Sequence, residues 1–210
     1  GTYLGGGDNS VSEVLASEGD VYYSSASDFF FQVVFVATAM SIISGAVAER
    51  MKLFAFLAFA VVMTGFIYPV QGFWKWGGGA LDEAGFLDFA GSGVVHMCGA
   101  AAALAGVILL GARKGKYGPN GQVNPQPGAN MPLATLGMFI LWFGWFGFNA
   151  GSALSAGSLA ATAMINTQIA SAAASMSWVL FEKYRDGKAT TLGVASGAIA
   201  GAVVITPACG

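Results

Sequence analysis

Long apolar stretches without charged residues are the feature that most constrains how this chain folds. A transmembrane helix needs roughly 20 predominantly apolar residues. Six such stretches follow one another, at residues 29–48, 53–74, 94–110, 133–154, 159–181 and 191–206. The sequence therefore predicts an all-α polytopic membrane protein with six transmembrane helices.

Of the six stretches, residues 159–181 are the least apolar. Alanine, serine and threonine dominate them, and Asn166 and Gln168 lie inside. Small polar residues are typical of a helix packed among other helices rather than facing lipid. The four-residue spacing of Gly193, Gly197 and Gly201, and that of Gly147 and Gly151, predicts faces where helix backbones approach closely.

The overall composition agrees with a membrane location and argues against two other classes of protein. Charged residues make up only 10% of the chain, against about 25% in an average soluble protein. Nine basic and eleven acidic residues nearly cancel, so nothing points to nucleic acid as a partner. The sequence also lacks catalytic groupings, a phosphate-binding loop and metal-ligand spacing, which predicts no enzyme activity, no metal and no cofactor.

The basic residues predict the orientation of the helices. Eight of the nine fall on alternate links, namely Arg50, Lys52, Arg113, Lys114, Lys116, Lys183, Arg185 and Lys188. Links rich in lysine and arginine lie on the cytoplasmic side of membrane proteins. The first helix is therefore expected to run from outside to inside, with both ends of the chain outside and residues 2–26 forming an external loop.

The domain organisation follows from the absence of any shift in composition along the chain. We expect a single domain over residues 1–210. The chain starts without methionine and stops directly after an apolar stretch. We therefore expect this domain to be incomplete at both ends.

The single histidine of the chain, His96, lies within the third apolar stretch. A charged side chain at the centre of a membrane helix costs about 2.5–3.5 kcal/mol on insertion scales, so ionisable residues there usually face a pathway or a partner. Two interpretations are open at this point. His96 either lines a pore or makes a hydrogen bond within the helix bundle.

Aromatic residues gather near the predicted outer ends of the helices. Phe31 and Phe35 are four residues apart and hence on one helix face, as are Phe148 and Ser152, while Trp76 follows the second stretch. A cation over an aromatic face gains roughly 0.5–2 kcal/mol. Two interpretations are therefore open. The aromatic residues form either a binding site for a cation or an ordinary interfacial belt of a membrane protein.

Asp88 precedes the third apolar stretch by a few residues. A carboxylate at this place can satisfy the free N–H groups of a helix start and favour its dipole. We favour this capping role over direct contact with a cationic solute, which a fixed carboxylate would hold too tightly for transport.

Five motifs in order resemble the ammonium transporter (Amt) family. They are SGAVAER at 44–50, WGGG at 76–79, DFAGSGVVH at 88–96, GWFGFNAGS at 144–152 and TPACG at 206–210. The resemblance implies a trimer of eleven-helix protomers, each with its own pore and built from two inverted five-helix halves. The six predicted helices would be family helices 3–8, with the same orientation that the charges predict.

The resemblance also implies roles for individual residues. It assigns the outer ammonium site to Phe31, Phe35, Trp76 and Ser152. Phe35 and Phe148 would form the phenyl gate beneath that site, with Asp88 as a structural carboxylate nearby. His96 would be the first of two pore histidines. The second belongs to the tenth family helix, which lies outside this chain.

The function implied by the resemblance is transport of ammonium or ammonia, with methylammonium as an analogue, across the plasma (inner) membrane. A homotrimer embedded in membrane lipid is expected, as is a trimeric signal-transduction protein as a cytoplasmic regulator. Two alternatives are open. One is an ammonium sensor or receptor built on the same membrane domain, and the other is a Rhesus-type ammonia gas channel.

Overall fold

The computed structural model describes residues 11–16 and 23–210, and almost all of their regular structure is helical. Within these residues the one β pairing is a bridge between Tyr117 and Val123. The chain divides into two compact units. The first comprises Gly1–Leu87 and Gly93–Gln126, and the second comprises Asp88–Ser92 and Pro127–Gly210.

Five helical stretches among the described residues are long and apolar enough to cross a membrane. They are Ser25–Val47 (α2), Leu53–Glu83 (α3 to α5), Ser92–Leu110 (η2 and α6), Met131–Gly151 (α7) and Thr191–Ala208 (α9 and η3). The sixth predicted span lies in α8, Ser158–Asp186, which is long enough with 29 residues. Its many small polar residues make it less apolar than the others, so its membrane crossing stays a prediction.

Polar residues cap three helices, and two of these, α2 and α7, start before the apolar stretches that predict them. The side chain of Ser24 accepts from the backbone N–H of Ser27 at 3.3 Å before α2. Asn130 does the same before α7 and Thr190 before α9. Such caps satisfy N–H groups that have no partner in the first turn. α2 and the short α1 (Val11–Ala16) thus occupy part of the predicted external loop, whose remainder lies largely outside the described residues.

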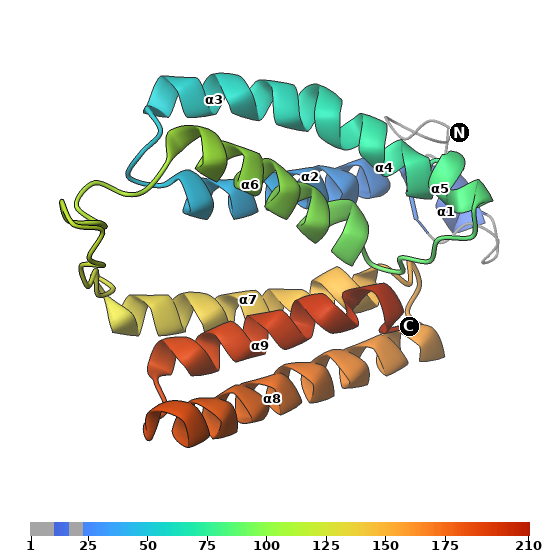
Figure 1. Cartoon of the computed structure of the whole chain (residues 1–210). Helices are drawn as coiled ribbons and strands as arrows, with labels where there is room; N and C mark the ends of the chain where they lie inside the picture. The colour runs from blue at the N-terminus through green and yellow to red at the C-terminus, as the bar shows by residue number, and fades with distance from the viewer. Residues whose placement is uncertain (1–10, 17–22) are drawn as a thin grey trace. The chain divides into compact units, whose positions relative to one another are not determined.

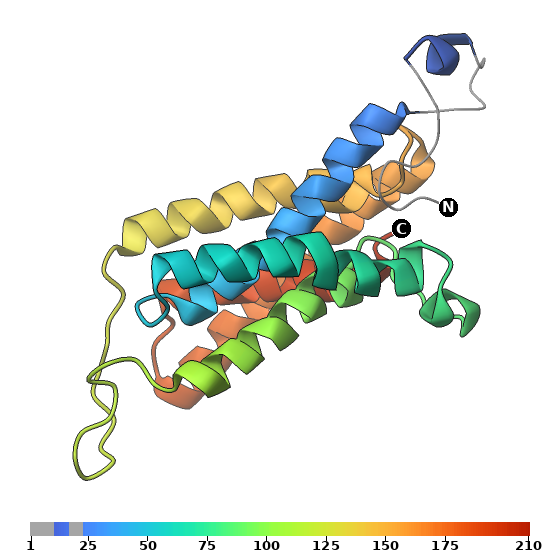
Figure 2. The same cartoon turned by 90° about the horizontal axis from the view of Figure 1, so that it is seen from above.

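In the first unit, α2 packs closely against α6 (Cys98–Leu110), as Figure 1 shows. A Cβ atom on Gly99 would lie 2.7 Å from the carbonyl oxygen of Ala39, so only glycine permits this approach. At the C-terminal ends of α2 and α6, the Arg50 guanidinium donates to the carbonyl oxygens of Ala46 and Gly111. Beyond α6, residues 111–126 form a loop that projects from the helix end (Figure 2).

The second predicted helix contains a π-helical turn. α3 (Leu53–Val62) continues through the π-helix η1 (Met63–Ile67) into α4 (Tyr68–Trp76). Pro69 lies at the start of α4 and has no N–H to donate to the preceding turn. The wider turn therefore coincides with the place where a proline interrupts the ordinary hydrogen-bond ladder.

In the second unit, α7, α8 and α9 lie side by side (Figure 1). Close packing of α9 on α8 confirms the prediction for its glycines, since a Cβ atom on Gly197 would lie 2.8 Å from the carbonyl oxygen of Ala174. The corresponding prediction for Gly147 on α7 has no such support, because no described atom lies within 4 Å of its Cβ position.

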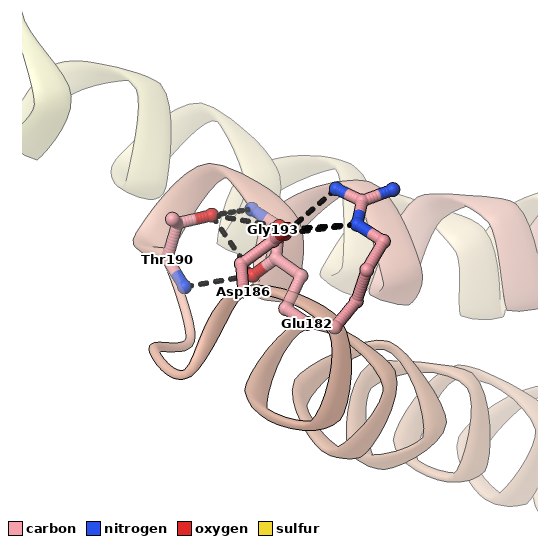
Figure 3. Close-up of polar contacts among 5 residues, drawn as sticks. Glu182, Asp186, Thr190 and Gly193 are labelled. Carbon is pink, nitrogen blue, oxygen red and sulfur yellow. Dashed lines mark hydrogen bonds and ion pairs between the residues drawn. The ribbon is translucent and has the colours of Figure 1, made fainter.

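The turn between α8 and α9 is closed by Glu182 (Figure 3). Its carboxylate accepts from the backbone N–H of Thr190 at 2.7 Å and from the Thr190 hydroxyl at 3.0 Å. The same hydroxyl accepts from the backbone N–H of Gly193 at 3.0 Å. The hydrogen bond from Thr190 lowers the pKa of Glu182 below its ordinary value.

Candidate functional site

Three of the four residues predicted for the outer site form an aromatic cluster in the first unit. The ring centroids of Phe31 and Phe35 on α2 lie 4.5 Å apart in an edge-on arrangement. Trp76, the last residue of α4, lies 5.9 Å from Phe35. Phe35 is only 3% exposed. The four-residue spacing thus correctly puts the two phenylalanines on one face, and the fold adds the indole.

The fourth residue predicted for the outer site, Ser152, and the predicted gate residue Phe148 lie in the second unit at the end of α7. The Ser152 hydroxyl donates to the carbonyl oxygen of Phe148 at 2.8 Å. The Phe148 ring lies 5.8 Å from that of Trp145. A common site formed by these residues and the aromatic cluster stays a prediction.

His96 lies within η2 (Ser92–Met97), a π-helical turn that leads directly into α6. The side chain is buried, with 9% exposure. Gln71 of α4 donates to the carbonyl oxygen of Val94 at 2.7 Å and so ties the two helices together beside His96. π-Helical turns are often found at functional sites. Sequence periodicity did not reveal this turn or the contact of Gln71.

Asp88 is buried in the second unit, and its carboxylate faces the start of η2. One oxygen, Oδ1, accepts from the backbone N–H of Gly91 at 3.0 Å and of Ser92 at 2.9 Å. This is the geometry that a helix-capping carboxylate adopts. A role near a bound cation stays a prediction.

Two of the motifs that carry the family resemblance, DFAGSGVVH at 88–96 and TPACG at 206–210, are joined by hydrogen bonds in the second unit. Backbone N–H groups of Phe89 and Ala90 donate to the carbonyl oxygens of Pro207 and Thr206, both at 3.1 Å. Pro207 and Thr206 belong to the short η3 (Thr206–Ala208). The loop that carries Asp88 is thereby fixed to the end of α9.

Polar residues inside the apolar helices form hydrogen bonds whose partners residue spacing alone does not assign. Asn149 donates through Nδ2 to the Thr167 hydroxyl at 2.8 Å, and Trp145 donates through Nε1 to the Thr206 hydroxyl at 3.0 Å. All four side chains are buried. The signal in the sequence was the four-residue spacing of Trp145 and Asn149 within an apolar helix.

A groove of about 600 Å³ opens in the first unit between α2, the α3–α4 helix and α6. Its walls are almost entirely apolar and include Trp74, which is 48% exposed. Such a lining is suited to hydrocarbon rather than to a cation. In the described residues there is no group of three histidine, cysteine or carboxylate side chains able to hold a metal ion.

Comparison with known proteins identifies the class. A model of the Ammonium Transporter Family matches residues 7–210. The chain is 46% identical over 192 residues to the ammonium transporter Amt2 of Archaeoglobus fulgidus, which covers 86% of this chain and 41% of the relative. It is also 46% identical over 191 residues to an ammonium transporter of Aquifex aeolicus, covering 91% of this chain and 43% of the relative.

Solved structures give the same result. A sensor Amt protein superposes with a TM-score of 0.85 at 41% identity, covering 88% of this chain and 47% of that protein. Candida albicans Mep2 superposes with a TM-score of 0.77 at 37% identity, covering 84% of this chain and 39% of that protein.

The chain belongs to the ammonium transporter family. The predicted family and the all-α polytopic membrane fold are confirmed. The chain spans less than half the length of the relatives it matches.

Proposed function

We propose that the protein containing this chain transports ammonium or ammonia through a hydrophobic pore with an outer cation-recruitment site. The observation that carries the proposal is the contact of Phe31, Phe35 and Trp76. These rings offer π-faces to a small cation. The names of the relatives, which are ammonium transporters, support the choice of ion.

The proposed mechanism separates binding of the ion from passage of the neutral molecule. Transfer of a bare ion from water into a low-dielectric interior costs on the order of 20 kcal/mol in the idealised Born picture. Cation–π contacts return only about 0.5–2 kcal/mol each. NH₄⁺ would therefore be held at Trp76 and lose its proton near the gate formed by Phe35 and Phe148. Ammonia would pass inward, while the proton is either excluded to the outside or carried separately.

We assign His96 to the pore on the basis of its burial in a membrane-length helix. A neutral imidazole donates a hydrogen bond with one nitrogen and accepts with the other. It can therefore relay a proton or hold ammonia, and it offers little to a potassium ion.

Trp76→Leu in the complete protein, expressed in cells lacking ammonium transporters, tests the proposed function. The leucine keeps apolar bulk but removes the π-face, so we expect methylammonium uptake with an apparent KM raised about two- to thirtyfold. Trp74→Leu is the matched control, since Trp74 lines the apolar groove. No uptake by correctly inserted wild-type protein would contradict the transport function.

The assembly and location belong to the same proposal. We infer a homotrimer in the plasma membrane, with the ends of this chain outside and a trimeric signal-transduction protein as regulator on the inner face. We further propose that the protein is not an enzyme. The multi-pass membrane character itself follows from the family and from the apolar helices.

The second candidate function is ammonium sensing. The similarity to a sensor Amt protein, with 41% identity over 88% of this chain, favours it. Binding of methylammonium without uptake, measured on the same purified wild-type protein, would support the sensor over the transporter.

A further inference from the structure

Two buried hydrogen bonds hold one face of α7 at the end that carries Phe148 and Ser152. Asn149 bonds to Thr167 of α8, and Trp145 bonds to Thr206 at the end of α9. Asn149 and Thr167 are both 0% exposed. Each of the α7 residues is thus tied to a different neighbouring helix.

The two bonds share one chemical pattern. The hydroxyl of Thr167 donates to the carbonyl oxygen of Ala163 at 2.6 Å. The hydroxyl of Thr206 likewise donates to the carbonyl oxygen of Ala202 at 2.7 Å. Because each hydroxyl has a single hydrogen, its lone pairs remain for a donor from α7. This requirement fixes the orientation of the Asn149 amide, whose Nδ2 must face Thr167.

The positions of the anchors restrict how α7 can move. Trp145 and Asn149 are four residues apart and lie on one face of the helix. Rotation of this end of α7 about its axis would break at least one of the two bonds. Phe148 lies between the anchors in the chain, contacts the Trp145 ring, and accepts from Ser152 through its carbonyl oxygen.

We propose that Thr167 is a positioning residue which, through Asn149, sets the placement of Phe148 and Ser152 for ammonium recruitment. The hydrogen bond between Trp145 and Thr206 is the second contact that holds this end of α7 in place. This inference rests on the proposed transport function for its kinetic consequence, and on the structure of the second unit for its geometry.

Thr167→Val in the complete protein is the test. Valine keeps the branched shape but leaves the Asn149 amide without its acceptor, whereas Thr167→Ser keeps the hydroxyl and serves as the rescue. Thr135→Val is the matched control, because the Thr135 hydroxyl donates to the Met131 carbonyl of its own helix at 3.0 Å. Two measurements are made on each variant: methylammonium uptake kinetics, and hydrogen exchange of residues 146–153 by mass spectrometry.

We expect Thr167→Val to raise the apparent KM about three- to tenfold, the effect of one lost hydrogen bond, and to speed exchange in residues 146–153. Thr167→Ser and Thr135→Val should resemble wild type in both measurements. Wild-type kinetics in Thr167→Val would overturn the proposal. So would uptake that falls only in proportion to the amount of inserted protein, with KM unchanged.

Failure of the transport function would be distinguishable from failure of this inference. If wild-type protein takes up no methylammonium, the transport proposal fails and hydrogen exchange decides the positioning role. Faster exchange in Thr167→Val than in Thr135→Val would then support the role, and equal exchange would overturn it.

Discussion

The rings of Phe35 and Trp76 lie 5.9 Å apart and join α2 to the end of α4. Phe31 extends this contact, with its ring centroid 4.5 Å from that of Phe35. The three rings come from two helices, α2 and α4, which a short link, α3 and the π-helical turn η1 separate in the sequence. The cluster therefore depends on the fold of the first unit as well as on the residue types.

Replacement of Phe31 by leucine should weaken recruitment of the cation without blocking the pore. The substitution removes a π-face worth about 0.5–2 kcal/mol and keeps an apolar side chain. We expect the apparent KM for methylammonium to rise about two- to thirtyfold while the maximal rate changes little. Phe30→Leu is the control, since Phe30 is 70% exposed. Equal effects of the two substitutions would contradict a specific role for Phe31.

Replacement of His96 by alanine tests the pore assignment. A buried hydrogen-bonding group contributes on the order of 1–3 kcal/mol, so we expect uptake in the complete protein to fall about tenfold or more. Discrimination between NH₄⁺ and K⁺ should fall with it. Met97→Ala, at an exposed neighbouring position, should leave both unchanged. Unaltered rate and selectivity in His96→Ala would exclude the proposed role.

Two substitutions of Asp88 separate capping from direct contact with a cation. Asp88→Asn keeps an oxygen that can accept from Gly91 and Ser92, whereas Asp88→Ala removes it. Loss of such a cap costs about 0.5–2 kcal/mol. We expect thermal unfolding to show destabilisation for the alanine variant alone, with methylammonium uptake largely retained by the asparagine variant. Loss of uptake in stable Asp88→Asn protein would instead indicate that the negative charge is required.

Much of the helical architecture could be predicted from the sequence, because a span across a membrane imposes both a length and an apolar composition. The helix ends were less predictable. α2 and α7, capped by Ser24 and Asn130, begin before their apolar stretches, whereas α9, capped by Thr190, begins at the first residue of its stretch. The π-helical turns η1 and η2 could not be predicted, because the periodicity of apolar residues over five or six positions does not distinguish a π-helix from an α-helix.

The candidate site was predictable only in part. Residues four apart on one helix, such as Phe31 and Phe35, could be assigned to one face from their spacing. The partner of Asn149 could not be assigned, because Thr167 lies on another helix and several hydroxyl groups of α8 were equally plausible. Helix pairing, which residue spacing does not encode, decides such contacts.

Substitution of Gly197 by alanine should destabilise the α8–α9 pair. The added Cβ atom would lie 2.8 Å from the carbonyl oxygen of Ala174 and 2.9 Å from the Cβ atom of Trp178. Overpacking of this kind typically costs about 1–3 kcal/mol. Gly147→Ala should have the opposite sign, because alanine is favoured over glycine in helices by about 1 kcal/mol and no described atom lies within 4 Å. Thermal unfolding of the complete protein in detergent compares the two, and equal shifts would contradict the packing role.

Glu182 should make the stability of the α8–α9 turn depend on pH. Its pKa is lowered from 4.5, mainly by the hydrogen bond from the backbone N–H of Thr190, so the folded state favours the charged form. The charged carboxylate therefore stabilises the folded state fully when the pH is above the ordinary pKa of 4.5. This stabilisation is lost as the pH falls through the lowered pKa that Glu182 has in the folded state.

Glu182→Gln removes the charge but keeps an oxygen that can accept a hydrogen bond. We therefore expect the variant to unfold at a lower temperature than wild type at pH 7, with the difference shrinking as the pH falls below 4.5. Glu83→Gln is a control, since Glu83 is exposed and lies in the short α5 (Ala80–Glu83) of the other unit. A difference between Glu182→Gln and wild type that stays constant with pH would show that the carboxylate acts through its shape rather than its charge.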